Sequence, residues 1–227
     1  MKATGLVFKS RDYIGSVQPP ATVLEDESRW GNNGTFKADG EPDWVQLPSG
    51  LWVQDFDGSD DEIALGNAAI LSFASGGITL MTWASIVATI RRQTFIGKAP
   101  GYNPNYRFHI DTEEKLAFSY RNAANTDTHT YTATEATGVG VWHHFAVSFT
   151  YGTGSSMVLY VDGAAIAGAW VGTGDDLPQE NIGETYIGFM SADRFENLMV
   201  KQRIYKYALS AADIAALFQS GRHWFGV

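Results

Sequence analysis

The 227-residue sequence contains no cysteine. This absence excludes disulfide scaffolds, cysteine-ligated zinc, iron–sulfur clusters and cysteine nucleophiles. Long apolar runs are also missing: the longest, 78–90, carries Thr and Ser and is shorter than the ~18 residues of a membrane span. Near the N-terminus, Lys9, Arg11 and Asp12 interrupt the chain before an apolar segment reaches the length of an export signal. We therefore expect no membrane span, no export signal and synthesis in the cytoplasm.

Charge is scarce, and basic residues are in the minority. Charged residues make up 18% of the chain, and 25 Asp and Glu against 16 Lys and Arg give a net charge of −9. Because phosphate-rich partners are bound by clustered Lys and Arg, this balance disfavours nucleic acid and anionic membranes as partners. With 44% hydrophobic and 13% aromatic residues, however, the chain has ample apolar surface for a folded core.

Turn signals and short strand patterns alternate along the chain. The dipeptides Asn-Gly and Asp-Gly, which favour tight turns, stand at 33–34, 39–40, 57–58 and 162–163. Segments 106–111 and 115–121 alternate apolar and polar residues, which predicts strands with one buried face. Segments 142–149 and 156–162 flank a short turn and predict a hairpin. Further strands are expected at 4–9, 50–57, 61–65, 78–87, 93–98, 128–134, 184–190 and 196–206.

This spacing of strands is typical of an all-β sandwich or barrel. No repeat, low-complexity tract or Pro/Gly/Ser-rich linker divides the chain, so we expect a single domain over residues 1–227. One helix is predicted at the end, capped by Ser210, with Asp213 in its first turn and Gly221 as its stop. We expect it to cover an open end of the sandwich through Ile214, Leu217 and Phe218.

Five segments, in chain order, carry a resemblance to a known family. They are 26–35 (DESRWGNNGT), 55–61 (DFDGSDD), 78–86 (ITLMTWASI), 142–163 (WHHFAVSF to LYVDG) and 203–214 (RIYKYALSAADI). Together they resemble the concanavalin A-like, laminin-G-like jelly-roll superfamily. The resemblance implies a two-sheet antiparallel jelly-roll sandwich, whose curved sheet commonly binds glycans in relatives. Four aromatic residues on the motif strands are expected to fill the core: Trp83, Trp142, Tyr160 and Tyr205.

Catalytic motifs are weak in this sequence. Glycoside hydrolysis needs two carboxylates held on one face of the site, but the three close pairs, Glu25 with Glu27, Asp55 with Asp57, and Glu113 with Glu114, lie beside turn residues. Nucleophile-elbow, zinc-protease, phosphate-loop and dinucleotide motifs are absent. A polysaccharide lyase or glycoside hydrolase is the enzymatic alternative. A lyase site would use the shared polar face of two strands, formed by Arg107, His109, Ser119 and Arg121.

Oxygen-bearing side chains suggest one metal site. Calcium is held by carboxylate and carbonyl oxygens, and members of the superfamily often carry a structural calcium ion. The candidate ligands are Asp26, Asn33, Asp57, Asp60 and Asp61. Relatives commonly have an acidic pair before the final R-I-Y strand, whereas this chain has Val200 and Lys201 there, which removes one expected ligand. The alternative is that these carboxylates form turns.

Binding of a sugar is the remaining chemistry that the sequence favours. Aromatic rings stack on pyranose faces, and Asn, Arg and His bind hydroxyl groups. The segment around 100–107 combines these residue types ahead of a strand. The candidate ligand-binding residues are Tyr102, Asn103, Asn105, Tyr106, Arg107, His109 and Arg121.

We therefore expect a non-catalytic recognition or assembly module that binds a glycan or another protein surface. A second hypothesis is a virion component, such as a phage decoration or tail protein, exposed on the virion surface. Its partners would be other virion proteins or further copies of itself. Such a role would suit a lectin-like fold without cysteine or an export signal.

Overall fold

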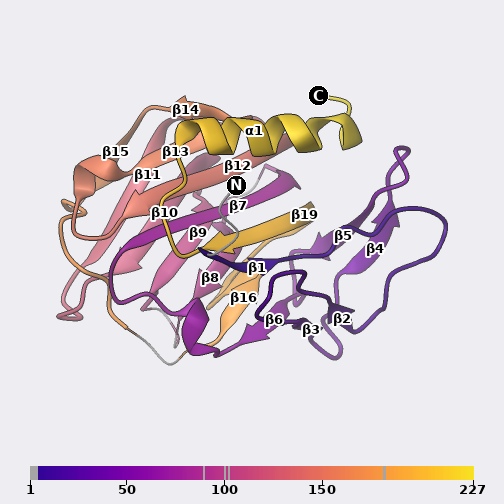
Figure 1. Ribbon diagram of the computed structural model, residues 1–227, viewed down its shortest axis with the longest axis horizontal. Coiled ribbons are helices and arrows are strands. Elements are labelled where there is room, and N and C mark those ends of the chain that lie inside the picture. The colour runs from indigo at the N-terminus through magenta and orange to yellow at the C-terminus, as the bar shows by residue number, and fades with distance from the viewer. Residues whose placement is uncertain (1–4, 89, 100, 102, 181–182) are drawn as a thin grey trace.

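The computed structural model describes residues 5–88, 90–99, 101, 103–180 and 183–227 (Figure 1). Two antiparallel sheets face each other. Sheet A has the order β14-β13-β12-β7-β19-β5-β4, and β1 also pairs with β19. Its strands are β1 (Leu6–Lys9), β4 (Asp43–Gln46), β5 (Trp52–Asp57), β7 (Gly77–Ser85), β12 (Trp142–Thr150), β13 (Val158–Val161), β14 (Ala164–Ile166) and β19 (Glu196–Tyr205).

Sheet B forms the opposite layer, with the order β15-β11-β10-β9-β8-β16-β6-β3-β2. Its strands are β2 (Val23–Leu24), β3 (Gly34–Phe36), β6 (Ile63–Gly66), β8 (Gln93–Lys98), β9 (Tyr106–Ile110), β10 (Lys115–Arg121), β11 (Thr128–Ala136), β15 (Gly168–Val171) and β16 (Thr185–Ile187). The remaining elements are the two-residue strands β17 (Phe189–Met190) and β18 (Asp193–Arg194), the helix α1 (Ala211–Gly221), and the 3₁₀ turns η2 (Ala69–Leu71), η3 (Gly154–Ser156) and η4 (Arg222–Trp224). The predicted all-β sandwich and C-terminal helix are confirmed.

The main core lies between the sheets and follows from strand alternation. On β12, Phe145, Val147 and Phe149 point towards sheet B and are fully buried. Phe95 of sheet B stacks on Phe145 with 5.1 Å between ring centroids. Burial of each such side chain stabilises the fold by about 1.5–3 kcal/mol, so this aromatic layer holds the two sheets together.

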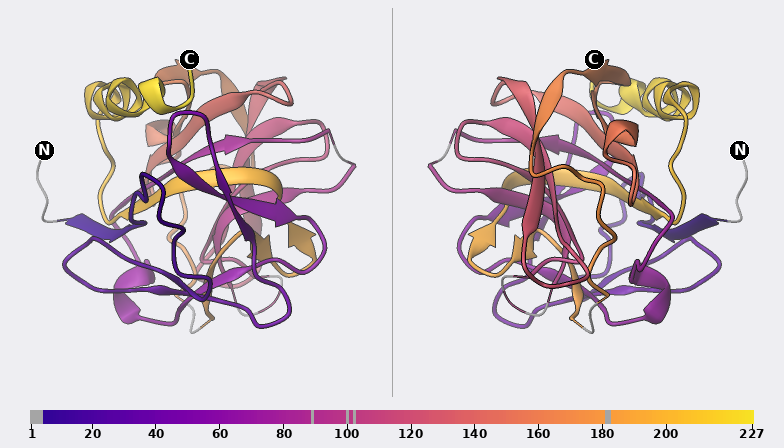
Figure 2. Two further views of the ribbon diagram at one scale, coloured as in Figure 1. Left: turned by 90° about the vertical axis from the view of Figure 1, so that its right-hand side faces the viewer. Right: turned by 90° about the vertical axis from the view of Figure 1, so that its left-hand side faces the viewer.

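Helix α1 lies on the outer face of sheet A, which differs from the expected position at an open end. Figure 2 shows it nearly end-on, outside the two sheets. Ile214 and Leu217 pack against Met81, Ala146 and Tyr160. The reason is strand alternation, since the side chains of β7 and β12 that do not enter the main core form an apolar outer surface that the helix covers.

One further expectation about this region needs correction. Trp83, Tyr160 and Tyr205 are buried on the outer side of sheet A, and Trp142 is partly buried there, so none of the four fills the core between the sheets. The expected end of the helix at Gly221 is confirmed: α1 ends there with a φ of −105°, and the chain continues as η4. A Cβ at Gly221 would lie 3.0 Å from Trp83 Nε1, so glycine serves the close approach of the helix to the sheet.

The predicted hairpin is confirmed, with Phe145 opposite Val161. The two alternating strands, β9 and β10, are enclosed on both faces, although their pattern predicted one exposed face. Their side chains on the outer face of sheet B lie in a groove, and other segments of the chain form its walls. No helix among the described residues is long and apolar enough to cross a membrane.

Candidate functional site

The outer face of sheet B is hollowed into a groove of about 420 Å³. Strand register assembles its floor: Arg107 on β9 is opposite Ser119 on β10, which is opposite Thr130 on β11. His109 lies on the same face of β9, two residues further along. Phe108 and Phe118, on the opposite face of these strands, enter the main core. The groove is lined by Arg92, Pro104, Arg107, His109, Asp111, Thr112, Ser119, Thr128, Thr130, Thr132 and Asp193.

One wall of the groove is the small hairpin of β17 and β18. It lies close over β8, because Gly97 has no side chain there: a Cβ would be 3.0 Å from Met190 Sδ. From this hairpin Asp193 forms an ion pair with Arg107, whose side chain is only 11% exposed. Burial lowers the pKa of Arg107, and Asp193 opposes that effect. The pairing fixes the guanidinium across the groove, and its buried Nε has no hydrogen-bond partner in the structure.

His109 is the second buried polar group in the groove. The residue is 2% exposed, and its Nδ1 has no hydrogen-bond partner among the described residues. Burial, followed by the positive charges of Arg107 and Arg92, lowers the pKa of His109 well below 6.5. The imidazole is therefore neutral at neutral pH, and it can donate or accept a hydrogen bond at Nδ1 depending on its tautomer.

Hydroxyl groups line the rest of the floor. Ser119 Oγ and Thr130 Oγ1 are 3.0 Å apart, and Thr128 and Thr132 continue the row on β11. At one end Arg92 is exposed, with no hydrogen bond or ion pair to any described residue. The lining thus offers donors and acceptors for a polyhydroxylated ligand, while aromatic stacking surfaces are missing from its described residues.

Some of the residues predicted to bind a ligand lie in or beside the groove, and others do not. Arg107 and His109 lie together in the groove floor. Arg121 lies beside it, donating hydrogen bonds to Asn125 Oδ1 at 3.0 Å and to Thr128 Oγ1 at 3.1 Å. Asn103 is half-buried and precedes Pro104 of the groove lining. Tyr102 lies outside the described residues.

Asn105 and Tyr106 are fully buried, in contrast to the open loop position expected for them. Asn105 Nδ2 donates to the carbonyl oxygens of Phe73 and Gln179, each at 2.6 Å, and Oδ1 accepts from Phe73 N–H at 2.9 Å. The Tyr106 ring packs edge-on against Phe73 with 5.3 Å between centroids. Tyr106 starts β9 with its side chain on the core side, so both residues hold the fold and do not reach the groove.

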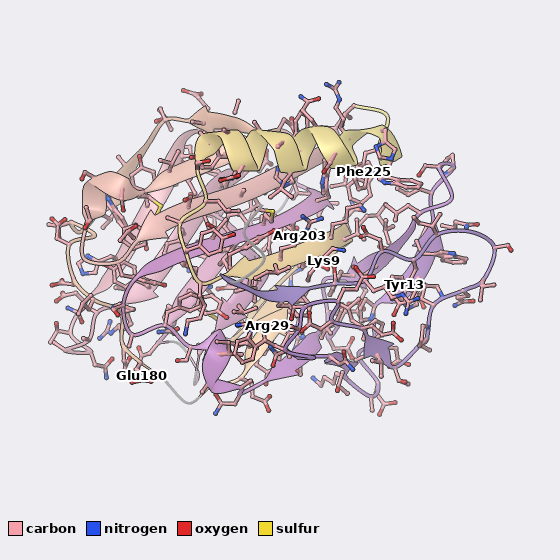
Figure 3. All side chains as sticks on the ribbon, viewed as in Figure 1. Lys9, Tyr13, Arg29, Glu180, Arg203 and Phe225 are labelled. Atoms are coloured by element: carbon pink, nitrogen blue, oxygen red, sulfur yellow. The ribbon has the colours of Figure 1, made fainter. Side chains whose placement is uncertain are left out.

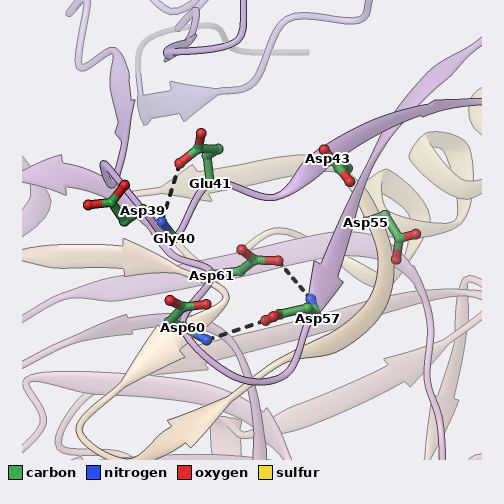
Figure 4. A pocket seen from close by; sticks show the side chains of 8 residues that line it. All are labelled: Asp39, Gly40, Glu41, Asp43, Asp55, Asp57, Asp60 and Asp61. Carbon is green, nitrogen blue, oxygen red and sulfur yellow. Dashed lines mark hydrogen bonds between the residues drawn. The ribbon is translucent and has the colours of Figure 1, made fainter.

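Acidic side chains gather in a second hollow, of about 400 Å³, beside the loop between β5 and β6 (Figure 4). Its lining includes seven carboxylates, namely Asp39, Glu41, Asp43, Asp55, Asp57, Asp60 and Asp61. Three of them, Asp57, Asp60 and Asp61, place one ligand atom each within 4.8 Å of the others. This cluster has the donor chemistry of a metal site.

Internal hydrogen bonds shape this acidic cluster. Asp57 Oδ1 accepts from Ser59 N–H at 2.7 Å, and Asp61 Oδ2 accepts from Asp57 N–H at 2.7 Å. Burial, together with the neighbouring charges of Asp57 and Asp60, raises the pKa of Asp61 to about 6. A cation in this hollow would relieve that repulsion.

Asp26 and Asn33 lie in a different loop. Asp26 Oδ1 accepts from Lys9 N–H and Ser28 N–H, and Oδ2 accepts from Asn32 N–H. Asn33 Oδ1 accepts from Asp26 N–H at 2.9 Å. The two residues thus order the segment that precedes β3, and Asp26 is not part of the three-carboxylate cluster.

The site residues that sequence reasoning missed come from distant segments. Asp193 reaches Arg107 across 86 positions of sequence, on a hairpin too short for a strand pattern. The row of threonines on β11 could have been predicted as part of the site. Thr128, Thr130 and Thr132 stand at every second position of a segment predicted as a strand, which places their hydroxyl groups on one face.

Comparison with solved structures finds the same fold in several binding domains. The binding domain of Paraclostridial Mosquitocidal Protein 1 superposes with a TM-score of 0.71 at 12% identity, over 96% of this chain and 52% of that one. The binding domain of botulinum neurotoxin DC, solved in complex with rat synaptotagmin II, gives 0.68 at 14% identity, over 96% and 52%. The sialidase of Trypanosoma rangeli, in complex with a difluoro-KDN sugar, gives 0.63 at 20% identity, over 97% and 33%.

The chain therefore spans about half of the toxin binding domains and a third of the sialidase. None of the curated proteins compared with it matches its sequence. At the level of family, residues 57–215 match the concanavalin A-like lectin/glucanases superfamily, from the end of β5 into α1. The resemblance of the sequence motifs is thereby confirmed: the chain belongs to the concanavalin A-like lectin/glucanases superfamily.

Proposed function

We propose that the protein is a non-catalytic recognition module that binds a carbohydrate in the groove of sheet B. The observation that carries the proposal is the convergence of Arg107, His109 and the hydroxyl row in one enclosed hollow. Two buried atoms there, Arg107 Nε and His109 Nδ1, have no partner in the structure. Because unpartnered buried polar atoms are costly, a ligand that bonds to them gains affinity.

The size and shape of the groove favour a sugar over a protein surface. A volume of about 420 Å³ is typical of a small-molecule pocket, whereas protein partners bind over broad surfaces. Hydroxyls, a neutral imidazole and a guanidinium match the alternating donors and acceptors of a sugar ring. The toxin domains with the same fold are named as binding domains, which supports a binding role.

The test is a glycan array followed by calorimetry with two matched variants. Thr130→Trp places a large ring on the groove floor. Thr134→Trp makes the same change on the same strand outside the groove lining, at an exposed position. We expect Thr130→Trp to weaken binding of the best glycan at least tenfold, about 1.4 kcal/mol. Thr134→Trp should leave the affinity unchanged. Equal affinities for the two variants, or no glycan bound by the wild type, would overturn the proposal.

A polysaccharide lyase or glycoside hydrolase is the second candidate, because a neutral imidazole beside a guanidinium suits proton abstraction next to a carboxylate. Incubation of the same glycan with the protein separates the two functions. Unsaturated products or new reducing ends that disappear in His109→Gln would establish the enzyme. Binding without products would establish the module.

We also propose that Asp57, Asp60 and Asp61 hold a structural calcium ion. Three carboxylates within ligand distance match the oxygen ligands that calcium takes. Calcium should raise the thermal unfolding temperature at pH 7.5, and less at pH 5, because protons then compete for Asp61, whose pKa is raised to about 6. Asp60→Asn should weaken calcium binding about tenfold.

The control for calcium is Asp39→Asn, which removes a charge from the same hollow but not from the cluster. Asp39 has φ +63°, a conformation that asparagine also adopts. If calcium leaves the unfolding temperature unchanged, or if both variants lose the same affinity, the three-carboxylate site is wrong.

Attachment to a virion, self-association and the place of the protein in or outside the cell stay predictions from the sequence. Cofractionation of the protein with purified particles, together with light scattering of the isolated chain, tests them. Protein that sediments free of particles would remove the virion hypothesis.

A further inference from the structure

A separate cavity of about 140 Å³ lies beneath the C-terminal helix, on the outer face of sheet A. Its charged and imidazole side chains come from strands β12 and β19 and from the segment after β1, and are Asp12, His144, Lys201 and Arg203, with Trp83 and Trp224 as aromatic walls. Figure 3 labels Arg203 just below α1 and close to Lys9 of β1. The cavity shares no lining residue with the groove of sheet B.

Positive charge exceeds negative charge in this cavity. Lys201 Nζ pairs with Asp12 Oδ2 at 2.6 Å and lies 5.8 Å from the centre of the Trp224 ring. The side chain of Arg203 makes no hydrogen bond or ion pair with any described residue. With His144 neutral, two cations and one carboxylate leave a local charge of 2 − 1 = +1, inside a protein whose net charge is −9.

Two buried polar atoms among the lining residues lack partners. His144 is 2% exposed, and its Nδ1 makes no hydrogen bond with any described residue. The buried Oδ1 of Asp12 likewise has no hydrogen-bond partner among these residues. Burial, and then the charge of Arg203, lowers the pKa of His144 to about 3. The imidazole therefore offers an uncharged N–H or a lone pair at Nδ1, depending on its tautomer.

A backbone irregularity brings Lys201 to this side of the sheet. Met199 and Ile204 face the main core, and Val200 faces the helix, so strict alternation would point Lys201 into the core. Instead the register of β19 against β7 shifts between Val200 and Arg203, and Lys201 takes φ +60°. Such a conformation is unfavourable for a residue with a side chain. As a result, the side chains of Lys201 and Arg203 both line the cavity.

We propose that this cavity binds a small oxyanion, a carboxylate or phosphate group, between Arg203 and Lys201, with His144 Nδ1 as a further donor. Since a water molecule occupies about 30 Å³ of liquid, the cavity has room for about four or five waters. One oxyanion group fits this space. Arg203 supplies the planar pair of donors that carboxylates and phosphates accept.

Calorimetric titration of the full chain with inorganic phosphate and with acetate, at constant ionic strength in sodium chloride, tests the proposal. We expect saturable binding of one ion per chain in the millimolar range, by phosphate, by acetate or by both. Arg203→Gln should weaken it at least tenfold. Arg29→Gln removes an exposed arginine outside the cavity and should bind as the wild type does. The absence of saturable binding, or an unchanged affinity in Arg203→Gln, would overturn the site.

A spectroscopic readout keeps the test independent of folding effects. The side-chain nitrogen signals of His144, assigned by comparison with His144→Phe, should shift along the same saturation curve as the calorimetric binding. Those of His109, in the groove of sheet B, should not follow that curve. Binding that moves both histidines equally, or neither of them, would contradict the assignment to this cavity.

Discussion

At the scale of residues, two of the buried histidines, His109 and His144, are the most informative groups in the protein. His109 lies in the groove of sheet B and His144 lies beneath α1, on the other side of the sandwich. Each has an unpartnered Nδ1 and a lowered pKa, chiefly because burial disfavours the charged imidazolium. Each hollow therefore keeps a neutral imidazole available for a hydrogen bond to a ligand.

The buried state of His144 predicts how stability changes with pH. The imidazole titrates near 6.5 when the chain is unfolded but near 3 when it is folded, so the unfolded state binds more protons between these values. Stability is complete above pH 6.5 and is lost as the pH falls. One such histidine costs about 2 kcal/mol between pH 7 and pH 5.

Urea unfolding of the wild type and of His144→Phe at both pH values, in buffers without phosphate, measures this effect. The variant should lose about 2 kcal/mol of the pH dependence. The raised pKa of Asp61 acts with the opposite sign, but it is common to both proteins and cancels in the comparison. Identical pH dependence in the two proteins would show that folding does not lower the pKa of His144.

Part of the groove could be predicted from the sequence. Alternation along two strands placed Arg107, His109 and Ser119 on one polar face, and the strand register confirms this arrangement. Asp193 could not be predicted, because its contact with Arg107 depends on how a distant hairpin folds over β8. The composition of segment 100–107 predicts that Tyr106 binds a ligand. Its side chain instead faces the main core, as does that of Phe108, two residues further along the strand.

At the scale of elements, local sequence determines where α1 begins, and the tertiary fold determines where the helix packs. Ser210 Oγ accepts from Asp213 N–H at 3.2 Å, and Asp213 Oδ2 accepts from Ser210 Oγ at 2.7 Å. These bonds define where the helix begins. Its position depends on the apolar outer face of sheet A, to which Ile214 and Leu217 attach.

The capping bond predicts a measurable loss of stability. Ser210→Ala should lower the free energy of unfolding by about 1 kcal/mol, because the N–H of Asp213 loses its acceptor. Ser220→Ala is the matched control, since Ser220 lies in the last turn and its hydroxyl donates to Leu217 O. Urea denaturation measures both. A larger loss in the control than in Ser210→Ala would show that the cap does not stabilise the helix.

The long strands could be predicted and the short ones could not. Segments such as β7 and β12 carry nine residues each, enough for alternation to be visible. Strands β2 and β18 have two residues each, and their pairing depends on neighbours in the sheet. The sequence predicts the helix correctly but not its position. Alternation along β7 and β12 gives sheet A an apolar outer face, but it does not say which segment of the chain covers that face.

At the scale of the whole molecule, one sandwich carries three chemically distinct hollows. The groove of sheet B combines hydroxyls with a buried guanidinium, the hollow beside the β5–β6 loop is acidic, and the cavity beneath α1 is positively charged. The net charge of −9 therefore does not indicate the local charge of any one of these sites. A single domain over residues 1–227 stays a prediction, and every site proposed in the molecule lies on this one two-sheet framework.

The nitrogen signals of His109 during titration with the best-bound glycan test the central claim most directly. Nδ1 has no partner in the free protein, so a sugar bound in the groove of sheet B changes its surroundings at once. The account predicts that His109 shifts in proportion to bound glycan while His144 stays constant. Glycan binding that leaves the His109 signals unchanged would contradict the account.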